Sequence, residues 1–408
     1  MGRLSSPGHV RRLAVETDRL LEFGAAARTM DGFGWLDDAG RLDVTRPTEL
    51  WITCRMTHVH ALGALLGRPG CAELADHGIA ALAGAFGDPE HGGWFTSVDR
   101  DGPVDTAKGA YPHAFVILAA ASAAAAGRPG AAELLDAALD VSLRHFWDDD
   151  AGMVVESWDR TFSAAEPYRG GNAAMHTVEA YLAAADASGD RAWLDRAIRT
   201  TERVLELARG NHWRIPEHFD TELRPLWEYN ADAPADPFRP YGATIGHSLE
   251  WSRLALNASA ALLARGDAPP DRMLADATAL FDAAVRDGWH VDGAPGFVYT
   301  VDWEGNPVVR RRLHWVLCEA LAAAATLFHV TGEERFDEAY RRWWEYAEAH
   351  LIDHNGGSWW HELTPTHAVS RTVWSGKPDV YHALQAALIP RLPPAPSLAS
   401  ALAQGLLR

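Results

Sequence analysis

The chain has 408 residues, of which 48% are hydrophobic and 23% charged, the usual composition of a globular protein. Its 37 basic and 55 acidic side chains give a formal net charge of −18 at pH 7, which argues against a binding surface for nucleic acid or for an anionic membrane. The three cysteines (Cys54, Cys71 and Cys318) form no CxxC motif, and no signal-peptide pattern is present, so we expect reduced thiols in a cytoplasmic protein.

The predicted elements begin with an amphipathic helix at 10–26, after which mostly apolar helices alternate with amphipathic ones. The apolar helices are expected, in chain order, at 49–66, 109–125, 171–185, 244–263, 312–328 and 377–389. The amphipathic helices are expected at 72–86, 131–147, 191–208, 271–287 and 335–351. A helix without a charged face is buried on most sides, whereas an amphipathic helix covers a core. The apolar set therefore predicts an inner wall and the amphipathic set an outer layer.

Short Gly/aromatic segments with strand character recur six times between these helices. They centre on Trp35, Trp94, Val154, Trp213, Phe297 and Trp359, at spacings of 59, 60, 59, 84 and 62 residues. A period of roughly 60 residues accommodates two helices and their connections, so the pattern predicts six helical hairpins. The tail after residue 389 is Pro-rich and supplies no sixth amphipathic helix, so 10–26 is expected to complete the outer ring. The sequence thus predicts a single all-α domain over 1–408, an (α/α)6 barrel with short β-hairpin segments between its repeats.

The one irregular interval, of 84 residues, contains a stretch rich in Pro, Asp, Asn and Gly at 228–242. This composition is typical of a long loop. Loops on rigid scaffolds often cover binding sites, so 228–242 is a candidate lid, with a surface insertion of no function as the alternative.

Every one of the six apolar helices carries polar or aromatic side chains that a closed ring would direct toward one cavity. These are Trp51, Arg55, His58, His60, Tyr111, His113, Asn172, His176, Glu179, His247, Glu250, Trp315, Glu319, Asp379 and His382. A lone histidine on an apolar helix is usually a core residue with satisfied hydrogen bonds. Burying polar groups costs free energy unless they are paired or used, so their recurrence in all six repeats predicts a functional pocket.

The spacing of the histidines favours proton transfer as the chemistry of this pocket. His176 with Glu179, and His247 with Glu250, are i, i+3 pairs on one helix face, where the carboxylate can fix the imidazole tautomer. His247 and His382 lie two repeats apart and would flank one cavity, as acid–base catalysis near neutral pH requires. Other histidines are weaker candidates. At most one of His58 and His60 can face the pocket, and both His113 and Glu319 could equally be structural.

Other chemistries have little support in the motifs. The sequence contains no HExxH motif and no Cys/His cluster, so we expect no metal site. It contains no Walker loop, no GxGxxG and no GxSxG, so we expect no cofactor and no serine nucleophile. A glycosidase that relies on carboxylates stays an alternative, because barrels of this kind host that reaction. The 17 tryptophans favour a carbohydrate ligand, since a rim containing Trp51, Tyr111, Trp251 and Trp315 could pack against sugar rings.

Several segments resemble the N-acylglucosamine 2-epimerase superfamily, in matching order along nearly the whole chain. They contain Trp51 and Arg55, Tyr111, Asn172 with His176 and Glu179, His247 with Glu250 and Trp251, and the segment GKPDVYHALQ at 376–385, which is the most specific. The chain is most similar to the aldose–ketose isomerase branch, which includes mannose isomerases and sulfoquinovose isomerases. The resemblance implies the same barrel and a cofactor-free proton transfer on an open-chain sugar through a cis-enediolate.

The resemblance also implies roles for individual residues. His382 would be the base at C2, His247 its partner, and His176 the histidine that contacts the substrate or opens its ring. Arg55 would stabilise the enediolate oxygens. The remaining positions would bind substrate or lie near it: Trp51, Tyr111, Asn172, Arg239, Glu250, Trp315 and Asp379.

The expected reaction is conversion of D-mannose to D-fructose, with D-lyxose to D-xylulose as a side reaction. The segment around GKPD favours an isomerase, and 359–373 contains no clear extra cationic clamp for a sulfonate. The alternatives are a sulfoquinovose isomerase, followed by a sugar 2-epimerase of the N-acylglucosamine or cellobiose type. Two further classes are a non-catalytic carbohydrate-binding barrel and a glycosidase that depends on Glu250 or Asp379. The sequence leaves open whether the protein is a monomer or a homo-oligomer.

Overall fold

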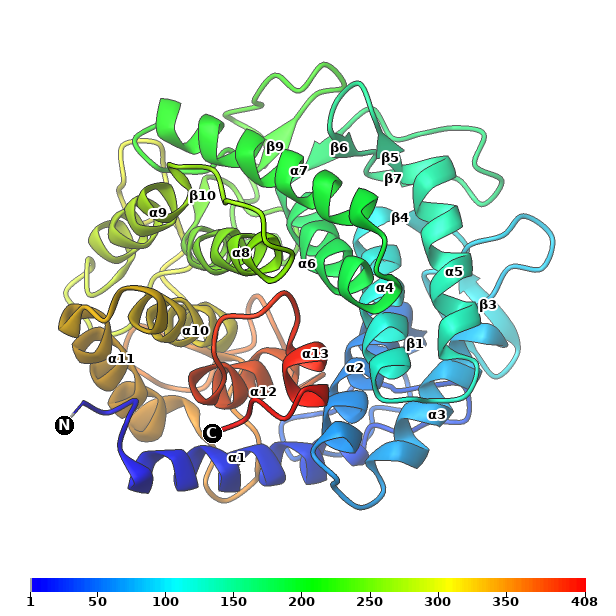
Figure 1. The fold of residues 1–408 in the computed structure, drawn as a ribbon, viewed down its shortest axis with the longest axis horizontal. Helices are drawn as coiled ribbons and strands as arrows, with labels where there is room; N and C mark the ends of the chain where they lie inside the picture. The colour runs from blue at the N-terminus through cyan, green and yellow to red at the C-terminus, as the bar shows by residue number, and fades with distance from the viewer. Residues whose placement is uncertain (1) are drawn as a thin grey trace.

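Five helical hairpins and a sixth helix pair, formed by the two ends of the chain, follow one another around a closed ring in the computed structural model, which describes residues 2–408 (Figure 1). The inner helices are α2 (Leu50–Leu65), α4 (Ala110–Ala125), α6 (Gly171–Ser188), α8 (Ile245–Ala264), α10 (His314–Thr331) and α12 (Tyr381–Leu388). The outer helices are α1 (Pro7–Ala25), α3 (Cys71–Ala83), α5 (Ala131–Val141), α7 (Arg191–Gly210), α9 (Met273–Gly288) and α11 (Glu334–Tyr346). Each inner helix contacts the next, α12 contacts α2, and α1 packs against α12. The (α/α)6 barrel is confirmed, and the N-terminal helix completes its outer ring as predicted.

Small side chains let the two layers approach closely. A Cβ at Gly78 of α3 would lie 1.9 Å from Oγ1 of Thr57 on α2, so only glycine permits this contact.

Helix α10 has 18 residues with a mean hydropathy of 1.2, and among residues 2–408 it alone is long and apolar enough to cross a membrane. Since 72% of α10 is buried inside the barrel, its apolar character is explained by its place in the inner wall.

Short antiparallel strand pairs connect the repeats. The strands are β1 (Thr48–Glu49), β2 (Ser97–Asp99), β3 (Gly102–Asp105), β4 (Lys108–Gly109), β5 (Trp147–Asp148), β6 (Met153–Val154), β7 (Ser157–Trp158), β8 (Arg169–Gly170), β9 (His218–Phe219), β10 (Ala243–Thr244), β11 (Thr300–Val301), β12 (Arg312–Leu313) and β13 (Glu362–Leu363). The pairs are β1–β2, β2–β3, β4–β7, β5–β6, β8–β9, β10–β11 and β12–β13. Strands β1, β4, β8, β10 and β12 each run directly into an inner helix. These pairs therefore fix where five of the inner helices begin, all at one end of the barrel.

Three local predictions were wrong. Trp213 lies not in a strand-like segment but in a turn, where its φ is +67°. Helix α12 begins at Tyr381 and not at 377, because Pro378 disfavours helix at the preceding residue and Asp379 Oδ1 accepts the Tyr381 N–H at 2.9 Å. The Pro-rich tail contains a short helix that we did not predict, α13 (Leu398–Ala403), which packs on α2, α4 and α6 and covers one end of the barrel.

Candidate active site

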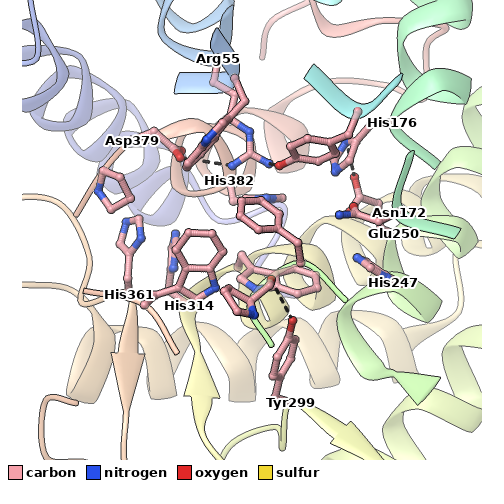
Figure 2. Close-up of a pocket in the computed structure, with 17 residues that line it drawn as sticks. Arg55, Asn172, His176, His247, Glu250, Tyr299, His314, His361, Asp379 and His382 are labelled. Atoms are coloured by element: carbon pink, nitrogen blue, oxygen red, sulfur yellow. Dashed lines mark hydrogen bonds and ion pairs between the residues drawn. The ribbon is translucent and has the colours of Figure 1, made fainter. Parts of the chain in front are cut away.

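A cavity opens at the end of the barrel where the inner helices begin, and it encloses about 620 Å³ of empty space including its open mouth (Figure 2). Ten of the eleven predicted site residues line it: Trp51, Arg55, Tyr111, Asn172, His176, His247, Glu250, Trp315, Asp379 and His382. Each of the six inner helices contributes a lining residue from its first three positions. The cavity is therefore surrounded by helix N-termini, whose dipoles favour negative charge.

His382 and His247 have the same arrangement on two different helices. His382 Nδ1 lies 3.0 Å from Glu319 Oε1, and His247 Nδ1 lies 2.9 Å from Glu217 Oε2. Both glutamates are buried, with exposed fractions of 0% for Glu319 and 4% for Glu217. An ionised carboxylate can only accept a hydrogen bond, so when these glutamates are ionised each ring donates from Nδ1 and keeps Nε2 as the basic nitrogen. Burial holds the pKa of His382 well below its usual value, with the nearby Arg55 charge adding to the effect, so this ring is neutral at pH 7.

The predicted pairing of His247 with Glu250 is wrong. Glu217, just before β9, takes that place, because the β8–β9 pair sets this segment beside the start of α6 and within reach of α8. The indole of Trp315 packs between the two histidines, with ring centroids 5.3 Å from His247 and 5.7 Å from His382. A Cβ at Gly246 would lie 2.1 Å from this indole, so glycine is required before His247.

Arg55 is held rigidly at the cavity wall. Its Nη1 donates to Asp379 Oδ2 at 3.2 Å and its Nη2 to the Tyr111 hydroxyl at 3.0 Å. The guanidinium also lies over the rings of Trp51 and Tyr381, at 5.0 and 4.7 Å. Burial opposes its charge, but Tyr111 and Asp379 outweigh burial and raise the Arg55 pKa. Asp379 itself lies in the loop before α12, and not on an inner helix as predicted.

His176 lies among carboxylates, as the i, i+3 spacing predicted. Its Nδ1 is 3.5 Å from Glu179 Oε2 and 4.0 Å from Glu250 Oε1, and burial lowers its pKa to about 4. Donor atoms of these three residues lie within 4.8 Å of one another, which is close enough to hold a metal ion. Arg253 Nη2, however, already donates to Glu250 Oε1 at 3.2 Å, and the Tyr381 hydroxyl donates to Glu179. A guanidinium beside these oxygens repels a second cation, so the residues fit a hydrogen-bonded cluster better than a metal site.

Seven lining residues were not assigned to the pocket by our sequence analysis: Pro237, Phe238, Tyr299, His314, His361, Trp374 and Pro378. His314 and His361 stack with their ring centroids 3.7 Å apart, and burial lowers the pKa of His361 to about 3. Both nitrogens of His314 and Nε2 of His361 have no hydrogen-bond partner among the described residues. Phe238 comes from the loop 228–242 and lies against Trp374 at the mouth, with centroids 5.3 Å apart. The two histidines supply neutral donors and acceptors, and Phe238 and Trp374 supply aromatic faces. Both are features of a site for a small polar ligand.

The remaining candidates lie outside the cavity. Arg239 forms a fork with Glu166, at 2.6 and 2.9 Å, and borders an adjoining space. His113 Nε2 accepts the Trp94 N–H at 3.1 Å, so His113 is structural. His58 bonds Ser122 Oγ at 2.7 Å, and His60 packs against Phe33, so neither of these two faces the pocket.

Residues 32–386 match the family model for N-acylglucosamine 2-epimerase (GlcNAc 2-epimerase). The chain is 54% identical over 399 residues to a D-mannose isomerase of Thermobifida fusca, with 97% of each chain covered. It is 52% identical over 402 residues to a D-mannose isomerase of Pseudomonas cannabina pv. alisalensis, with 98% of this chain and 97% of that one covered. A crystal structure of D-mannose isomerase superposes with a TM-score of 0.86 at 27% identity, covering 94% of this chain and 98% of the other.

Proposed function

Because the chain belongs to the N-acylglucosamine 2-epimerase family, we propose that it is an aldose–ketose isomerase that converts D-mannose to D-fructose. The observation that carries the chemistry is the pair His382 and His247, each with Nδ1 on a buried glutamate and each lining the same cavity. Two imidazoles, each oriented through Nδ1 so that Nε2 is free to take or give a proton, are what a 1,2-proton transfer requires. The relatives that cover almost the whole chain are D-mannose isomerases, which supports mannose as the substrate.

The proposed reaction begins with the open-chain aldose. His176 helps to open the sugar ring, and His382 Nε2 then takes the proton from C2. The electron pair of the broken C2–H bond forms the C1–C2 double bond, and the π electrons of the C1 carbonyl move onto O1. The result is a cis-enediolate. Delivery of a proton to C1 and transfer of the O2 proton to O1 complete the ketose, with His247 as the partner that carries a proton to C1 or O1. The net reaction consumes no proton and no cofactor.

Positive charge at the site stabilises the enediolate oxygens. Arg55 stays charged and is oriented by Asp379 and Tyr111 before the substrate arrives, so little reorganisation is needed at the moment of reaction. The helix N-termini around the cavity add to this potential. Preorganised donors of this kind typically contribute about 3–4 kcal/mol each to transition-state stabilisation.

Mannose is preferred to sulfoquinovose because the cavity offers no free cation. Among the described lining residues Arg55 is the single arginine or lysine, and its guanidinium is already taken by Asp379 and Tyr111. Arg239 in the loop 228–242 is another cation that could bind a sulfonate, but it is already paired with Glu166. A sulfonate would thus have to break an existing ion pair, whereas the C6 hydroxyl of mannose can bond to neutral groups.

Loop 228–242 contributes Pro237 and Phe238 to the cavity, and Phe238 lies between Tyr111 and Trp374 at the mouth. We include in the proposal that this loop is the lid that admits the sugar and then excludes water.

The test is incubation of purified, EDTA-treated protein with D-mannose in D2O, followed by NMR of the products. Fructose formed without added metal, with deuterium at C1 or with the C2 hydrogen transferred to C1, supports the isomerase. Glucose as the first product indicates a 2-epimerase. Inertness toward mannose with turnover of sulfoquinovose indicates the other isomerase branch. Binding without any turnover, unaffected by His247→Ala and His382→Ala, indicates a carbohydrate-binding barrel.

A further inference from the structure

Three glutamates from three successive inner helices converge at the wall of the cavity, which one of them, Glu250, lines. They are Glu179 of α6, Glu250 of α8 and Glu319 of α10, and the last two have exposed fractions of 0%. Arg253, one helical turn after Glu250, lies among them and is itself 5% exposed. Among residues 2–408, Arg253 is the one arginine or lysine that forms an ion pair with this glutamate cluster.

Arg253 connects to the proposed C2 base through a single carboxylate. Its Nε donates to Glu319 Oε2 at 3.0 Å, and the other oxygen of Glu319 accepts from His382 Nδ1 at 3.0 Å. The Arg253 Nη2 donates to Glu250 Oε1 at 3.2 Å. Arg253 does not line the catalytic cavity, so it can affect the chemistry only through these neighbours.

Three acids and one guanidinium packed together in the barrel interior cannot all be ionised, because burial penalises every unpaired charge. Burial raises the pKa of Glu250 well above its usual value, and the neighbouring Glu319 adds to this. Burial also raises the pKa of Glu319, but the Arg253 charge opposes the increase. At Glu179, burial is outweighed by the neighbouring His176, 3.5 Å away, and by the Arg253 charge, and the pKa is lowered. Arg253 Nε donates directly to Glu319 at 3.0 Å, whereas Oε2 of Glu250 has no partner among residues 2–408. These contacts and the directions of the pKa shifts both favour Glu250 as the group that holds the proton and Glu319 as the ionised one.

The state of Glu319 decides which nitrogen of His382 is basic. An ionised Glu319 accepts a hydrogen bond, so the ring proton stays on Nδ1 and Nε2 is free. A protonated Glu319 would donate to Nδ1, the ring proton would move to Nε2, and no base would face C2. The other catalytic histidine has no such support, because Glu217 forms no ion pair with an arginine or lysine in residues 2–408 and its Oε1 has no partner.

We propose that Arg253 is a positioning residue that keeps Glu319 ionised and thereby holds His382 in the tautomer with a free Nε2. This inference rests on the proposed function insofar as it concerns catalysis, but the tautomer can be measured on the protein without substrate. The asymmetry between His382, which has an arginine behind its glutamate, and His247, which has none, agrees with His382 as the base and His247 as its partner.

The test compares the wild type with Arg253→Met and Arg253→Lys. Long-range ¹H–¹⁵N NMR of the histidine rings identifies the tautomer of His382, and kinetics with D-mannose give kcat and KM across pH. For Arg253→Met we expect the proton on Nε2 near neutral pH, a kcat about 10²–10³-fold lower, and a KM within about threefold of wild type. Arg253→Lys keeps the charge and should recover most of kcat together with the wild-type tautomer.

The pH profile separates this role from simple damage to the fold. The groups that face Glu319 and Arg253 are Glu250 on α8, Glu179 and His176 on α6, Tyr381 and His382 on α12, and Cys318 on α10 itself. Burial raises the pKa of both Tyr381 and Cys318 well above the usual value, so neither titrates in the working range. In Arg253→Met the activity should therefore increase as pH rises through the elevated pKa of Glu319, which a misfolded protein would not show.

A matched control is Arg214→Met, which removes a largely buried guanidinium paired with Asp287 at 2.9 Å, away from the cavity. It should lower stability without altering the His382 tautomer or kcat. The proposal is overturned if Arg253→Met retains the wild-type tautomer and rate, or if its loss of activity is equal at every pH. If Arg253→Met does not fold, the wild-type spectrum decides, because a proton on Nε2 of His382 in the wild type also overturns the proposal. A wild type with the expected tautomer but no turnover of mannose refutes the proposed function and leaves this inference intact.

Discussion

Replacing Glu217 by glutamine is the most direct check of the acid–base pair, because Glu217 touches His247 and does not line the cavity. Glu217 Oε2 accepts from His247 Nδ1 at 2.9 Å, and Glu217 is 4% exposed. Glutamine keeps the shape and can still offer an oxygen to Nδ1, but it removes the negative charge. The structure therefore predicts a variant that folds normally and loses the support that His247 receives whenever it carries a second proton.

The size of the effect follows from the type of hydrogen bond. A bond to a charged group contributes about 1.5–3 kcal/mol and a neutral one about 0.5–1.5 kcal/mol, so the charge itself accounts for about 1–2 kcal/mol. If this difference appears only as the imidazolium forms, kcat falls about 5- to 30-fold. Glu217 does not line the catalytic cavity, so KM should change less than about threefold.

The assay is the initial rate of fructose formation from D-mannose at several substrate concentrations, with folding checked by circular dichroism and thermal unfolding. The matched control is Glu16→Gln on α1, another buried carboxylate, which pairs with Arg19 at 2.9 Å and lies outside the cavity. The control should leave kcat unchanged. A folded Glu217→Gln protein with wild-type kcat, or one with a raised KM at unchanged kcat, would refute the assignment of Glu217 to the support of His247.

Three further predictions concern catalysis, pH and stability. His382→Asn should lower kcat about 10²–10⁴-fold and abolish deuterium exchange at C2 of mannose, whereas retained exchange would assign the base elsewhere. Burial lowers the pKa of His60 to about 4 from 6.5, so the unfolded chain binds more protons below pH 6.5 and stability is lost as pH falls. This histidine alone should contribute about 2 kcal/mol of the loss between pH 7 and pH 5, measured by urea unfolding, and His60→Phe should show a smaller pH dependence. Lys377→Met breaks the buried pair with Asp353 at 2.6 Å and should cost about 3–5 kcal/mol of unfolding free energy, and an unchanged unfolding midpoint would contradict this.

The helical alternation could be predicted because it depends on local periodicity. The inner helices α2, α4 and α8 begin within one residue of their predicted starts, since the change from strand to apolar helix is marked by residues next to one another in the chain. The start of α12 and the existence of α13 were missed for local reasons as well. Asp379 Oδ1 accepts the Tyr381 N–H and so sets the start of α12, and α13 has only six residues and follows directly on the Pro-rich stretch.

Within the site, the sequence identified the residues whose own helix positions direct them inward. His247, His382, Arg55 and His176 all belong to this group, and all line the cavity. Sequence alone therefore determined the six repeats, from the period of roughly 60 residues along the chain, and most of the polar lining, from the spacing within each helix.

Only the tertiary structure decided which groups these residues meet. Glu217 reaches His247 from 30 positions earlier in the chain, and Glu319 reaches His382 from 63 positions earlier. The stacked His314 and His361 also come from different repeats. Such partners depend on how the ring closes, and their protonation depends on how completely the closed ring excludes water. Both are properties of the assembled barrel, since burial and the distance between charges do not exist until the repeats have packed together.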